Sequence, residues 1–258
     1  MKKDLLVVCS KSTKKYFKSY ERHYVVTSPP KKDILELKDS EDVVIAIGGG
    51  ATIDTAKIIS KNPIISYPTT AAGSAKTSHS VYWDGINKLS MKKHIPKEAH
   101  VVEEYVKDLP SSIVECTTYD ALSHCLDSMW SKRSSKESMY YVDQALEILK
   151  GDFSNSDLIH AGNLAGSAIE LCPTTILHSL SYPITAYYGI SHGVALGYLL
   201  PKISQFMNTD ISDYIKYPPV RLPQVDPILI AKESLKYSKI YDTIKNVDMD
   251  ILVDILSS

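Results

Sequence analysis

A run of three glycines stands directly behind a short, mostly apolar segment of the chain. The segment at residues 42–47 reads DVVIAI, and the sequence continues GGGATIDTAK to residue 57. A continuous apolar run of this length is typical of a strand that is buried on both faces, as in a parallel sheet. Glycines, which have no Cβ atom, let the backbone turn sharply where such a strand ends. The feature predicts a strand–turn–helix unit and therefore an α/β fold.

Other short apolar segments in the first third of the chain support a parallel sheet. They are Asp4–Cys9, Tyr24–Thr27 and Pro63–Tyr67. Polar or helical connections separate them, which is the βαβ pattern of an α/β domain. We therefore expect residues 1–108 to form a nucleotide-binding domain with a Rossmann-like parallel sheet.

The character of the sequence changes after Leu109-Pro110, where apolar residues begin to recur at helical spacing. The expected helices are Ser111–Trp130, Lys136–Lys150, Asp157–Leu171 and a segment that starts near Gly193. Ser111 and Ser112 are the expected N-cap of the first of these helices. We expect residues 109–258 to form an all-helical second domain.

The balance of charge excludes a general attraction to nucleic acid, because 29 basic residues oppose 30 acidic ones. The four cysteines show no CxxC spacing and are interpreted as reduced thiols, which favours a cytoplasmic protein. The apolar run that follows Met1 is too short for a signal peptide. No run approaches the roughly 20 apolar residues of a membrane span. We expect neither a nucleic-acid partner nor a membrane partner.

The glycine turn is also a candidate anion site. Unpaired N–H groups at the start of a helix suit a pyrophosphate, here at Gly48, Gly49, Gly50 and Ala51. Ile53 stands where the third glycine of G-x-G-x-x-G would be, so the motif is not the usual one. The alternative interpretation is a purely structural turn, with Asp54 offsetting the helix dipole.

A second polar turn follows the strand expected at residues 63–67. Thr69, Thr70 and Ser74 carry small hydroxyl groups that can hydrogen-bond phosphate or ribose. Such residues are also common in ordinary loops, so this turn alone indicates little.

One carboxylate and three imidazoles form a candidate metal site. Asp120 and His124 are four residues apart in an apolar helical segment, which places them on one face. His178 and His192 follow, and the four side chains together suit a divalent metal with one open position. Asp127 is a rival carboxylate. The alternative for any single histidine on an apolar helix is a hydrogen-bonded core residue, the interpretation that we give to His23, His94, His100 and His160.

Taken in order, these motifs resemble the iron-containing alcohol dehydrogenases. GGGATIDTAK resembles the family's GGGSxxDxAK loop, and PTTAAGSAKT resembles its PTTAGTGSE segment. The Asp-x-x-x-His pair, then two histidines fourteen residues apart with HG-x-A-x-G-x-L-L-P after the second, matches the family's four metal ligands. The motifs extend from about residue 42 to residue 201. The resemblance implies the family's fold, which dehydroquinate synthases share.

The resemblance also implies a mechanism. NAD or NADP would lie along the glycine turn, with its pyrophosphate at Gly49, Gly50 and Ala51. The cofactor-binding set would be completed by Gly48, Asp54, Thr69, Thr70 and Ser74. Fe²⁺ or Zn²⁺ would be bound by Asp120, His124, His178 and His192. The metal would polarise the carbonyl of a small aldehyde, and the nicotinamide would supply the hydride.

Within the family, several segments look like the phosphonoacetaldehyde reductases, which work in phosphonate metabolism. They are YWDGINKLS, DSMWSKRSSKES and HSLSYPITAYYGISHG. For such a substrate, Lys76 and His79 are the candidate partners of the phosphonate, with a solvated lysine and a surface histidine as the alternative. Lys76 replaces a glutamate of the family pattern. Tyr182 stands where many members have a histidine near the substrate; it is the candidate proton donor, with a packing role as the alternative.

Three other readings stay open at this point. One is reduction of a different small or phosphorylated aldehyde or ketone. Another is the chemistry of dehydroquinate synthases or glycerol-1-phosphate dehydrogenases, whose ligands are arranged differently. The third is a catalytically inactive relative that binds nucleotide or a partner protein, because both ends of the chain are shorter than is usual in the family. A homodimer is the candidate assembly.

Overall fold

A parallel sheet forms the N-terminal half of the computed structural model, which describes residues 5–17, 22–37, 40, 42–222 and 224–257. Its strand order is β2–β1–β3–β4–β7, and every pairing is parallel. The strands are β1 (Leu5–Ser10), β2 (His23–Val26), β3 (Val43–Gly48), β4 (Ile65–Pro68) and β7 (Glu98–Ala99). Asp4, the first residue of one expected strand, lies outside the described residues. The expected parallel sheet is confirmed.

Both faces of the sheet are covered, which explains why its strands are continuously apolar. On one face, Val8 and Val44 pack with Ile53 of α1 (Gly50–Ile59). On the other face, Val7 and Ile47 belong to a cluster against which Phe17, Tyr67 and Tyr105 pack, the last from α2 (Glu103–Val106). Because apolar side chains pack against both faces, these strands do not need a two-residue alternation.

The strand order places a crevice beside the glycine turn. The chain runs from β1 to β2 on one side and then crosses back to β3 on the other side of β1. In open parallel sheets, ligands bind at the carboxyl ends of the strands where the order reverses in this way. Here those ends are Ser10 of β1 and Gly48 of β3. The strand order and the glycine turn thus predict a ligand-binding site at the same edge of the sheet.

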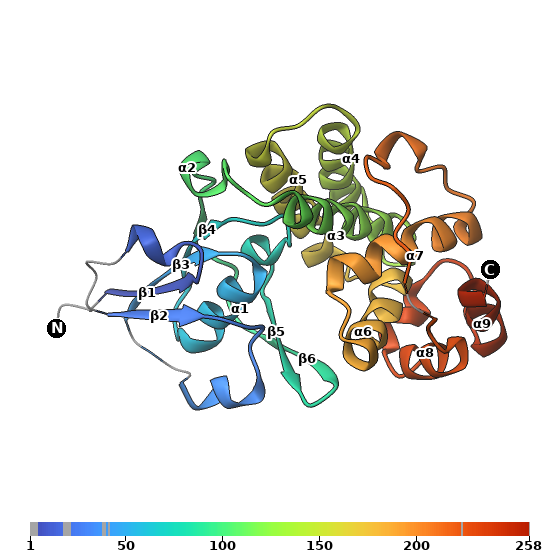
Figure 1. Cartoon of the computed structure of the whole chain (residues 1–258), viewed down its shortest axis with the longest axis horizontal. Helices are drawn as coiled ribbons and strands as arrows, with labels where there is room; N and C mark the ends of the chain where they lie inside the picture. The colour runs from blue at the N-terminus through green and yellow to red at the C-terminus, as the bar shows by residue number, and fades with distance from the viewer. Residues whose placement is uncertain (1–4, 18–21, 38–39, 41, 223, 258) are drawn as a thin grey trace.

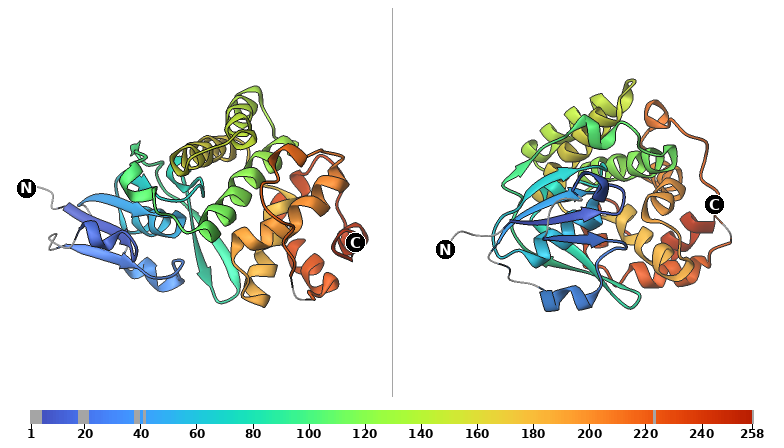
Figure 2. Two further views of the ribbon diagram at one scale, coloured as in Figure 1. Left: turned by 45° about the horizontal axis from the view of Figure 1, so that its top comes forward. Right: turned by 60° about the vertical axis from the view of Figure 1, so that its left-hand side comes forward.

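A β-hairpin that the sequence analysis did not anticipate follows the second polar turn. It consists of β5 (His79–Asp84) and β6 (Asn87–Lys92), which pair antiparallel. Gly85, with φ of 60°, forms its tight turn. The hairpin reaches away from the sheet toward helix α6 (Ile176–Tyr188) in both Figure 1 and Figure 2. It therefore brings residues of the N-terminal half to the helical half.

Helices make up the C-terminal half, as expected (Figure 1). Besides α6, they are α3 (Ser111–Met129), α4 (Lys136–Lys150), α5 (Asn155–Leu171), α7 (His192–Met207), α8 (Pro227–Ser234) and α9 (Met249–Ser257). Short 3₁₀ helices are η1 (Lys14–Tyr16), η2 (Lys32–Leu37), η3 (Ser74–Lys76), η4 (Ser212–Tyr214) and η5 (Ser238–Asp242). Serines 135 and 154 form capping boxes that set the starts of α4 and α5.

The N-cap expected for α3 is wrong. The helix begins at Ser111 itself, and the cap position is held by Pro110, which makes no side-chain cap hydrogen bond. Proline fixes φ near the helical value, so it can start a helix without a capping hydroxyl. The predicted domain limit between residues 108 and 109 falls just before this point and stays a prediction.

Helix α5 packs directly against the backbone of the second polar turn. A Cβ atom added at Gly162 would lie 2.4 Å from the Cα atom of Ala71, and one added at Gly166 would lie 2.4 Å from the carbonyl oxygen of Gly73. Real Cβ atoms do not approach backbone so closely, so these two positions require glycine. The close contact with α5 thereby fixes the position of the second polar turn relative to the helical half.

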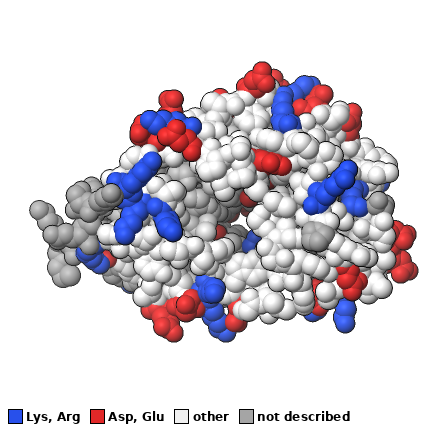
Figure 3. Space-filling view, viewed as in Figure 1, with Lys and Arg blue, Asp and Glu red and all other residues white. Residues whose placement is uncertain are grey.

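The surface carries charges of both signs. Figure 3 shows basic and acidic side chains interspersed around one face, which is hollowed near its centre and largely uncharged there. Basic and acidic side chains both occur among the described residues on this face, in keeping with the balanced composition. Among the described residues, no helix is both long and apolar enough to span a bilayer.

Candidate metal and cofactor site

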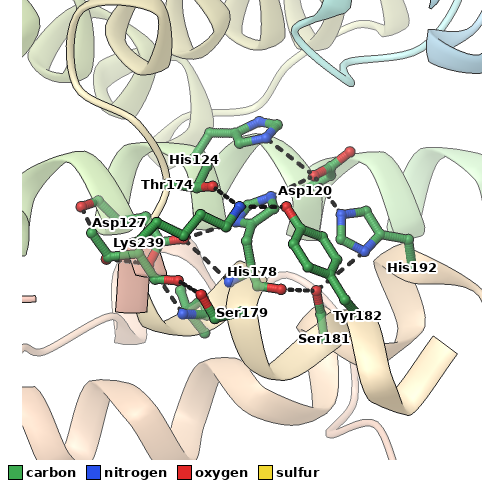
Figure 4. Close-up of polar contacts among 12 residues, drawn as sticks. Asp120, His124, Asp127, Thr174, His178, Ser179, Ser181, Tyr182, His192 and Lys239 are labelled. Carbon is green, nitrogen blue, oxygen red and sulfur yellow. Dashed lines mark hydrogen bonds and ion pairs between the residues drawn. The ribbon is translucent and has the colours of Figure 1, made fainter. Parts of the chain in front are cut away.

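The four predicted metal ligands come together from three helices. Asp120 and His124 lie on α3, His178 on α6, and His192 is the first residue of α7. Figure 4 shows the Asp120 carboxylate facing the three imidazole rings. Its Oδ1 atom is 3.4 Å from Nε2 of His178, 3.6 Å from Nε2 of His124 and 3.8 Å from Nε2 of His192. Residues more than 70 positions apart therefore converge on one carboxylate oxygen.

Asp120, His178 and His192 form the tightest part of this arrangement, and we call them the Asp120 cluster. One ligand atom from each lies within 4.8 Å of the others. Oδ1 of Asp120 and Nε2 of His178 are buried and have no hydrogen-bond partner among the described residues. Leaving such atoms unpaired in the interior is costly. A divalent cation bound between them would satisfy both, so the residues fit a metal of the kind that the sequence predicted.

His124 takes a slightly different position. Its ring stacks on that of His178, with centroids 4.5 Å apart and planes 12° apart. Its Nε2 atom still faces Asp120, whereas its Nδ1 atom is buried and has no hydrogen-bond partner among the described residues. The four-residue spacing correctly predicted that His124 and Asp120 share a face. The structure places this ring beside the Asp120 cluster rather than within its 4.8 Å group.

Asp127 orients His178 instead of facing the other ligands. Its Oδ2 atom lies 2.8 Å from Nδ1 of His178 and accepts the backbone N–H of the same residue at 3.2 Å. Its Oδ1 atom accepts from the Thr175 hydroxyl at 2.8 Å and from the N–H of Leu177 at 3.1 Å. The carboxylate thus caps the start of α6. It also holds the imidazole with its Nε2 lone pair toward Asp120.

The protonation states suit cation binding. Burial would raise the pKa of Asp120, but His124, His178 and His192 together hold it well below its usual range. Burial lowers the pKa of His124 to about 4 and that of His192 far below its ordinary value. Near neutral pH the Asp120 carboxylate is therefore ionised and the imidazoles of His124 and His192 are neutral, which are the forms that ligate a metal.

Tyr182 lies beside the Asp120 cluster. Its ring stacks on His192, with centroids 5.7 Å apart and planes 25° apart, and lies edge-on to His178 at 6.3 Å. Its hydroxyl is 2.6 Å from Nζ of Lys239, a residue of η5 that the sequence analysis did not single out. Burial raises the pKa of Tyr182, so the phenol keeps its proton at neutral pH. Position thus agrees with the predicted donor role without deciding between that role and packing.

The glycine turn borders a cavity of about 320 Å³ at the carboxyl ends of β1 and β3. Of the predicted cofactor residues, Gly49, Thr69 and Thr70 line it. The same cavity is lined by Ser10, the last residue of β1, and by Ser12 and Thr13, which follow it. Sequence reasoning missed these three, although their place directly after the first strand was the available signal.

The turn itself fits a close approach of backbone and ligand. Helix α1 starts at Gly50, and its cap residue Gly49 offers no side-chain hydrogen bond, which leaves the first N–H groups to another partner. A Cβ atom at Gly49 would lie 2.9 Å from Oγ1 of Thr70, and one at Gly50 would lie 3.1 Å from Oγ of Ser74. The two predicted loops are therefore in contact, and together they fit the pyrophosphate of a dinucleotide.

Asp54 faces into the protein. It is buried, and its Oδ1 atom pairs with Nζ of Lys57 at 3.2 Å. The same Nζ donates to the carbonyl oxygens of Ser74, Thr77 and His79. The pair thus holds the second polar turn and the start of the hairpin. Its described contacts do not include the cavity, so a direct cofactor contact of Asp54 stays a prediction.

The two residues predicted to bind a phosphonate lie elsewhere. The His79 side chain is 55% exposed, with Nδ1 4.0 Å from a carboxylate oxygen of Glu170. Lys76 ends η3 and is partly exposed. None of the contacts among the described residues links either side chain to the Asp120 cluster. Their substrate role stays a prediction.

Comparison with known proteins decides the family. Residues 114–248, just over half of the chain, match the family described as "Fe-containing alcohol dehydrogenase family, C-terminal". The chain belongs to the iron-containing alcohol dehydrogenase family. Residues 22–104 separately match "Iron-containing alcohol dehydrogenase". The two matches cover the sheet-containing half and the helical half in turn.

Individual iron-containing alcohol dehydrogenase relatives are distant and differ in substrate. The NAD-dependent methanol dehydrogenase of Bacillus methanolicus is 25% identical over 202 residues, covering 64% of this chain and 53% of that protein. The phosphonoacetaldehyde reductase of Streptomyces viridochromogenes is 27% identical over 209 residues, with the same two coverages. The 4-hydroxybutyrate dehydrogenase of Clostridium kluyveri is 26% identical over 243 residues, covering 79% of this chain and 63% of that protein. The chain thus spans less than two thirds of the length of each.

Solved structures confirm the fold. An iron-containing alcohol dehydrogenase from Thermotoga maritima superposes with a TM-score of 0.80 and 23% identity, covering 99% of this chain and 90% of that one. The sulfoacetaldehyde reductase from Bifidobacterium kashiwanohense, in complex with NAD⁺, gives a TM-score of 0.81 at 20% identity, with the same coverages. The expected family fold, a parallel sheet followed by helices, is therefore shown.

Proposed function

We propose that this protein is a metal-dependent, NAD(P)H-linked alcohol dehydrogenase or aldehyde reductase. The observation that carries the proposal is the convergence of Asp120, His178 and His192, because two of their buried ligand atoms have no hydrogen-bond partner among the described residues and a bound cation would satisfy both. Family membership supports the same reaction. The cavity at the glycine turn supplies a place for the dinucleotide.

Asp120, His178 and His192 would hold Fe²⁺ or Zn²⁺, with His124 as the fourth ligand. When bound, the metal supplies Lewis-acid polarisation of a carbonyl group and NAD(P)H supplies the hydride. Asp127 keeps a proton on Nδ1 of His178, so that Nε2 stays available as a ligand. Oγ of Ser181 lies 3.3 Å from Nδ1 of His192 and in the same way holds that ring with its Nε2 atom toward Asp120.

Tyr182 is our candidate for supplying the proton that the reduced substrate takes up. Its phenol is protonated near neutral pH and lies next to the ring of His192. Nζ of Lys239, 2.6 Å away, can donate to the phenolic oxygen and so stabilise the phenolate that remains after proton transfer. Tyr182 in this way takes the place of the histidine that the family pattern has at this point.

Phosphonoacetaldehyde is the finer substrate candidate. It is supported by the similarity of three sequence segments and by the Streptomyces relative at 27% identity. Relatives at 25% and 26% identity act on methanol and 4-hydroxybutyrate by their names, and they favour other small aldehydes equally. The substrate is therefore a question for assay.

The test is metal analysis of the purified protein, together with NADH and NADPH oxidation in the presence of phosphonoacetaldehyde and a panel of small aldehydes. We expect stoichiometric metal and turnover that a chelator abolishes. His178→Ala should lose both metal and turnover, whereas the control His160→Ala, at an exposed position on α5, should keep both. Metal retention and full activity in His178→Ala would refute the assignment. Cofactor binding without metal or turnover would instead favour the inactive relative.

A further inference from the structure

Lys239 carries a positive charge next to the Asp120 cluster, and among the described residues it has no acidic partner within ion-pair distance. Its Nζ atom lies 2.6 Å from the Tyr182 hydroxyl and 2.7 Å from the Thr174 hydroxyl, both neutral groups (Figure 4). Within the described part of the chain, no carboxylate lies within the 4.0 Å of an ion pair with it. Burial lowers the pKa of Lys239 to about 8, and the more distant Asp127 opposes this shift. At neutral pH the ammonium group is thus charged and held in place but not neutralised.

Lys88 brings a second positive charge to the same place from the other half of the chain. It lies on β6 of the hairpin, and its Nζ atom is 4.2 Å from the centre of the Tyr182 ring. Nζ of Lys239 is 4.4 Å from the same centre. Two ammonium groups from distant segments therefore surround one aromatic ring, which stacks on His192. Like charges repel, so this arrangement favours an anion between or beside them.

We propose that Lys239, with Lys88 as the second positive charge, binds the anionic group of a short aldehyde substrate whose carbonyl faces the Asp120 cluster. The inference rests on the proposed function and narrows its substrate class to aldehydes that carry a phosphonate or a carboxylate. The centre of the Tyr182 ring is 5.7 Å and 6.3 Å from the rings of His192 and His178. A substrate that reaches both the lysines and the cluster therefore has only a few bonds between its two ends.

This assignment differs from the one that the sequence suggested. Lys76 and His79 have no described contact with the Asp120 cluster, and the carboxylate of Glu170 beside His79 would repel an anion. Lys239 has no carboxylate within ion-pair distance in the described part of the chain. Its two hydroxyl partners, Tyr182 and Thr174, orient its ammonium group at the site. The two lysines are thus the better candidates for recognising a negative charge.

The test compares substrates that differ in charge. We would measure kcat/KM of the metal-loaded protein for phosphonoacetaldehyde, succinic semialdehyde and butanal, which carry a phosphonate, a carboxylate and no charge. In Lys239→Met, kcat/KM for an anionic aldehyde relative to that for butanal should fall about 10- to 100-fold, the usual loss for removing a charged hydrogen-bond donor. The control Lys232→Met removes one charge from an exposed position on α8 and should leave the ratio unchanged.

Each outcome decides the proposal. A ratio that falls for both acids supports recognition of charge in general, and one that falls for a single acid identifies the phosphonate or the carboxylate as the ligand. An equal loss for butanal and the anionic aldehydes would overturn the proposal, because Lys239 would then act only through Tyr182 or the fold. Lys88→Met, with exposed Lys92→Met on the same strand as its control, should lower the same ratio. An equal loss of kcat/KM for butanal would show that Lys88 does not bind the anionic group.

A binding measurement separates this inference from the proposed function. If the wild-type protein reduces no aldehyde, the proposed function fails while the anion site can still be tested. Titration calorimetry with methylphosphonate and with acetate then measures the site directly. Binding that is at least 10-fold weaker in Lys239→Met than in wild type and in Lys232→Met would support the site. Equal affinities, or no binding of either anion to the wild-type protein, would refute it.

Discussion

Asp127→Asn is a small change outside the proposed metal site that should lower the affinity of that site for metal. Asp127 accepts four hydrogen bonds, two on each oxygen. Asparagine is almost the same size but replaces one oxygen by an NH₂ group, which donates instead of accepting. One pair of donors must then lose its acceptor. If the oxygen keeps Thr175 and Leu177, the amide nitrogen faces the backbone N–H and Nδ1 of His178.

The consequence reaches the metal through the tautomer of His178. Facing an NH₂ group, Nδ1 becomes the acceptor and the ring proton moves to Nε2, the atom that lies 3.4 Å from Asp120. A protonated Nε2 has no lone pair for a cation. Loss of such an orienting partner typically lowers metal affinity about 10- to 100-fold, which corresponds to roughly 1.4–2.7 kcal/mol. In the opposite orientation the amide nitrogen faces Thr175 and Leu177. The Thr175 hydroxyl and the Leu177 N–H at the start of α6 then lose their acceptor, and His178 is held less firmly.

Zinc affinity, measured by competition with a chelator, is the direct assay for Asp127→Asn. Denaturant unfolding of the metal-free protein would report any general loss of stability. Thr175→Val is the matched control, because it removes one hydrogen bond from Oδ1 of Asp127 and leaves the contact of Oδ2 with His178 in place. It should keep zinc affinity near that of wild type. An Asp127→Asn protein that binds zinc within twofold of wild type would refute the argument.

Three further predictions concern packing, charge and pH. Gly166→Ala should lower the free energy of unfolding by about 1–3 kcal/mol, because the new methyl group would lie 2.4 Å from the carbonyl oxygen of Gly73; a loss below about 0.5 kcal/mol in denaturant unfolding would contradict this. Lys57→Met should lower the free energy of unfolding by about 3–5 kcal/mol in the same assay, because it leaves the Asp54 carboxylate buried without its ion-pair partner. Adding Asp54→Asn should recover part of that loss. Burial lowers the pKa of Lys239 from 10.5 to about 8. Between pH 8 and pH 10.5 the unfolded chain therefore binds more protons than the folded protein, so the free energy of unfolding should rise with pH across that window. Urea unfolding of wild type against Lys239→Met at pH 8 and pH 10 measures this, and a difference that is independent of pH would contradict it.

The sheet and the helices were predictable because their signals are local. Strands buried on both faces appear as unbroken apolar runs, and β3 was expected within one residue of its observed bounds. The expected limits of α4 match the structure, since the capping box at Ser135 and Ser138 marks its start. The β5–β6 hairpin was missed although Asp84-Gly85 is a common hairpin turn signal. Its strands are short and partly polar, so periodicity alone did not reveal them.

The site was only partly predictable because its decisive contacts are long-range. Four-residue spacing was enough to place Asp120 and His124 on one face. Spacing did not distinguish a ligand from an orienting group, and Asp127 was weighed as a rival ligand although it holds His178. Lys239 meets Tyr182 across 57 residues of chain with no motif at either position. Such a contact depends on how α6 and η5 pack, which no local pattern encodes.

The glycines of α5 also bear on how this protein can be rebuilt. At Gly162 and Gly166 the helix and the polar turn meet backbone against backbone, with no side chain between them to adjust the fit. The sheet-containing half is therefore not an interchangeable part. A chimera that joins it to the helices of a relative needs glycine at both positions. Without them, the turn that carries Thr70 would be displaced from the glycine turn that it contacts.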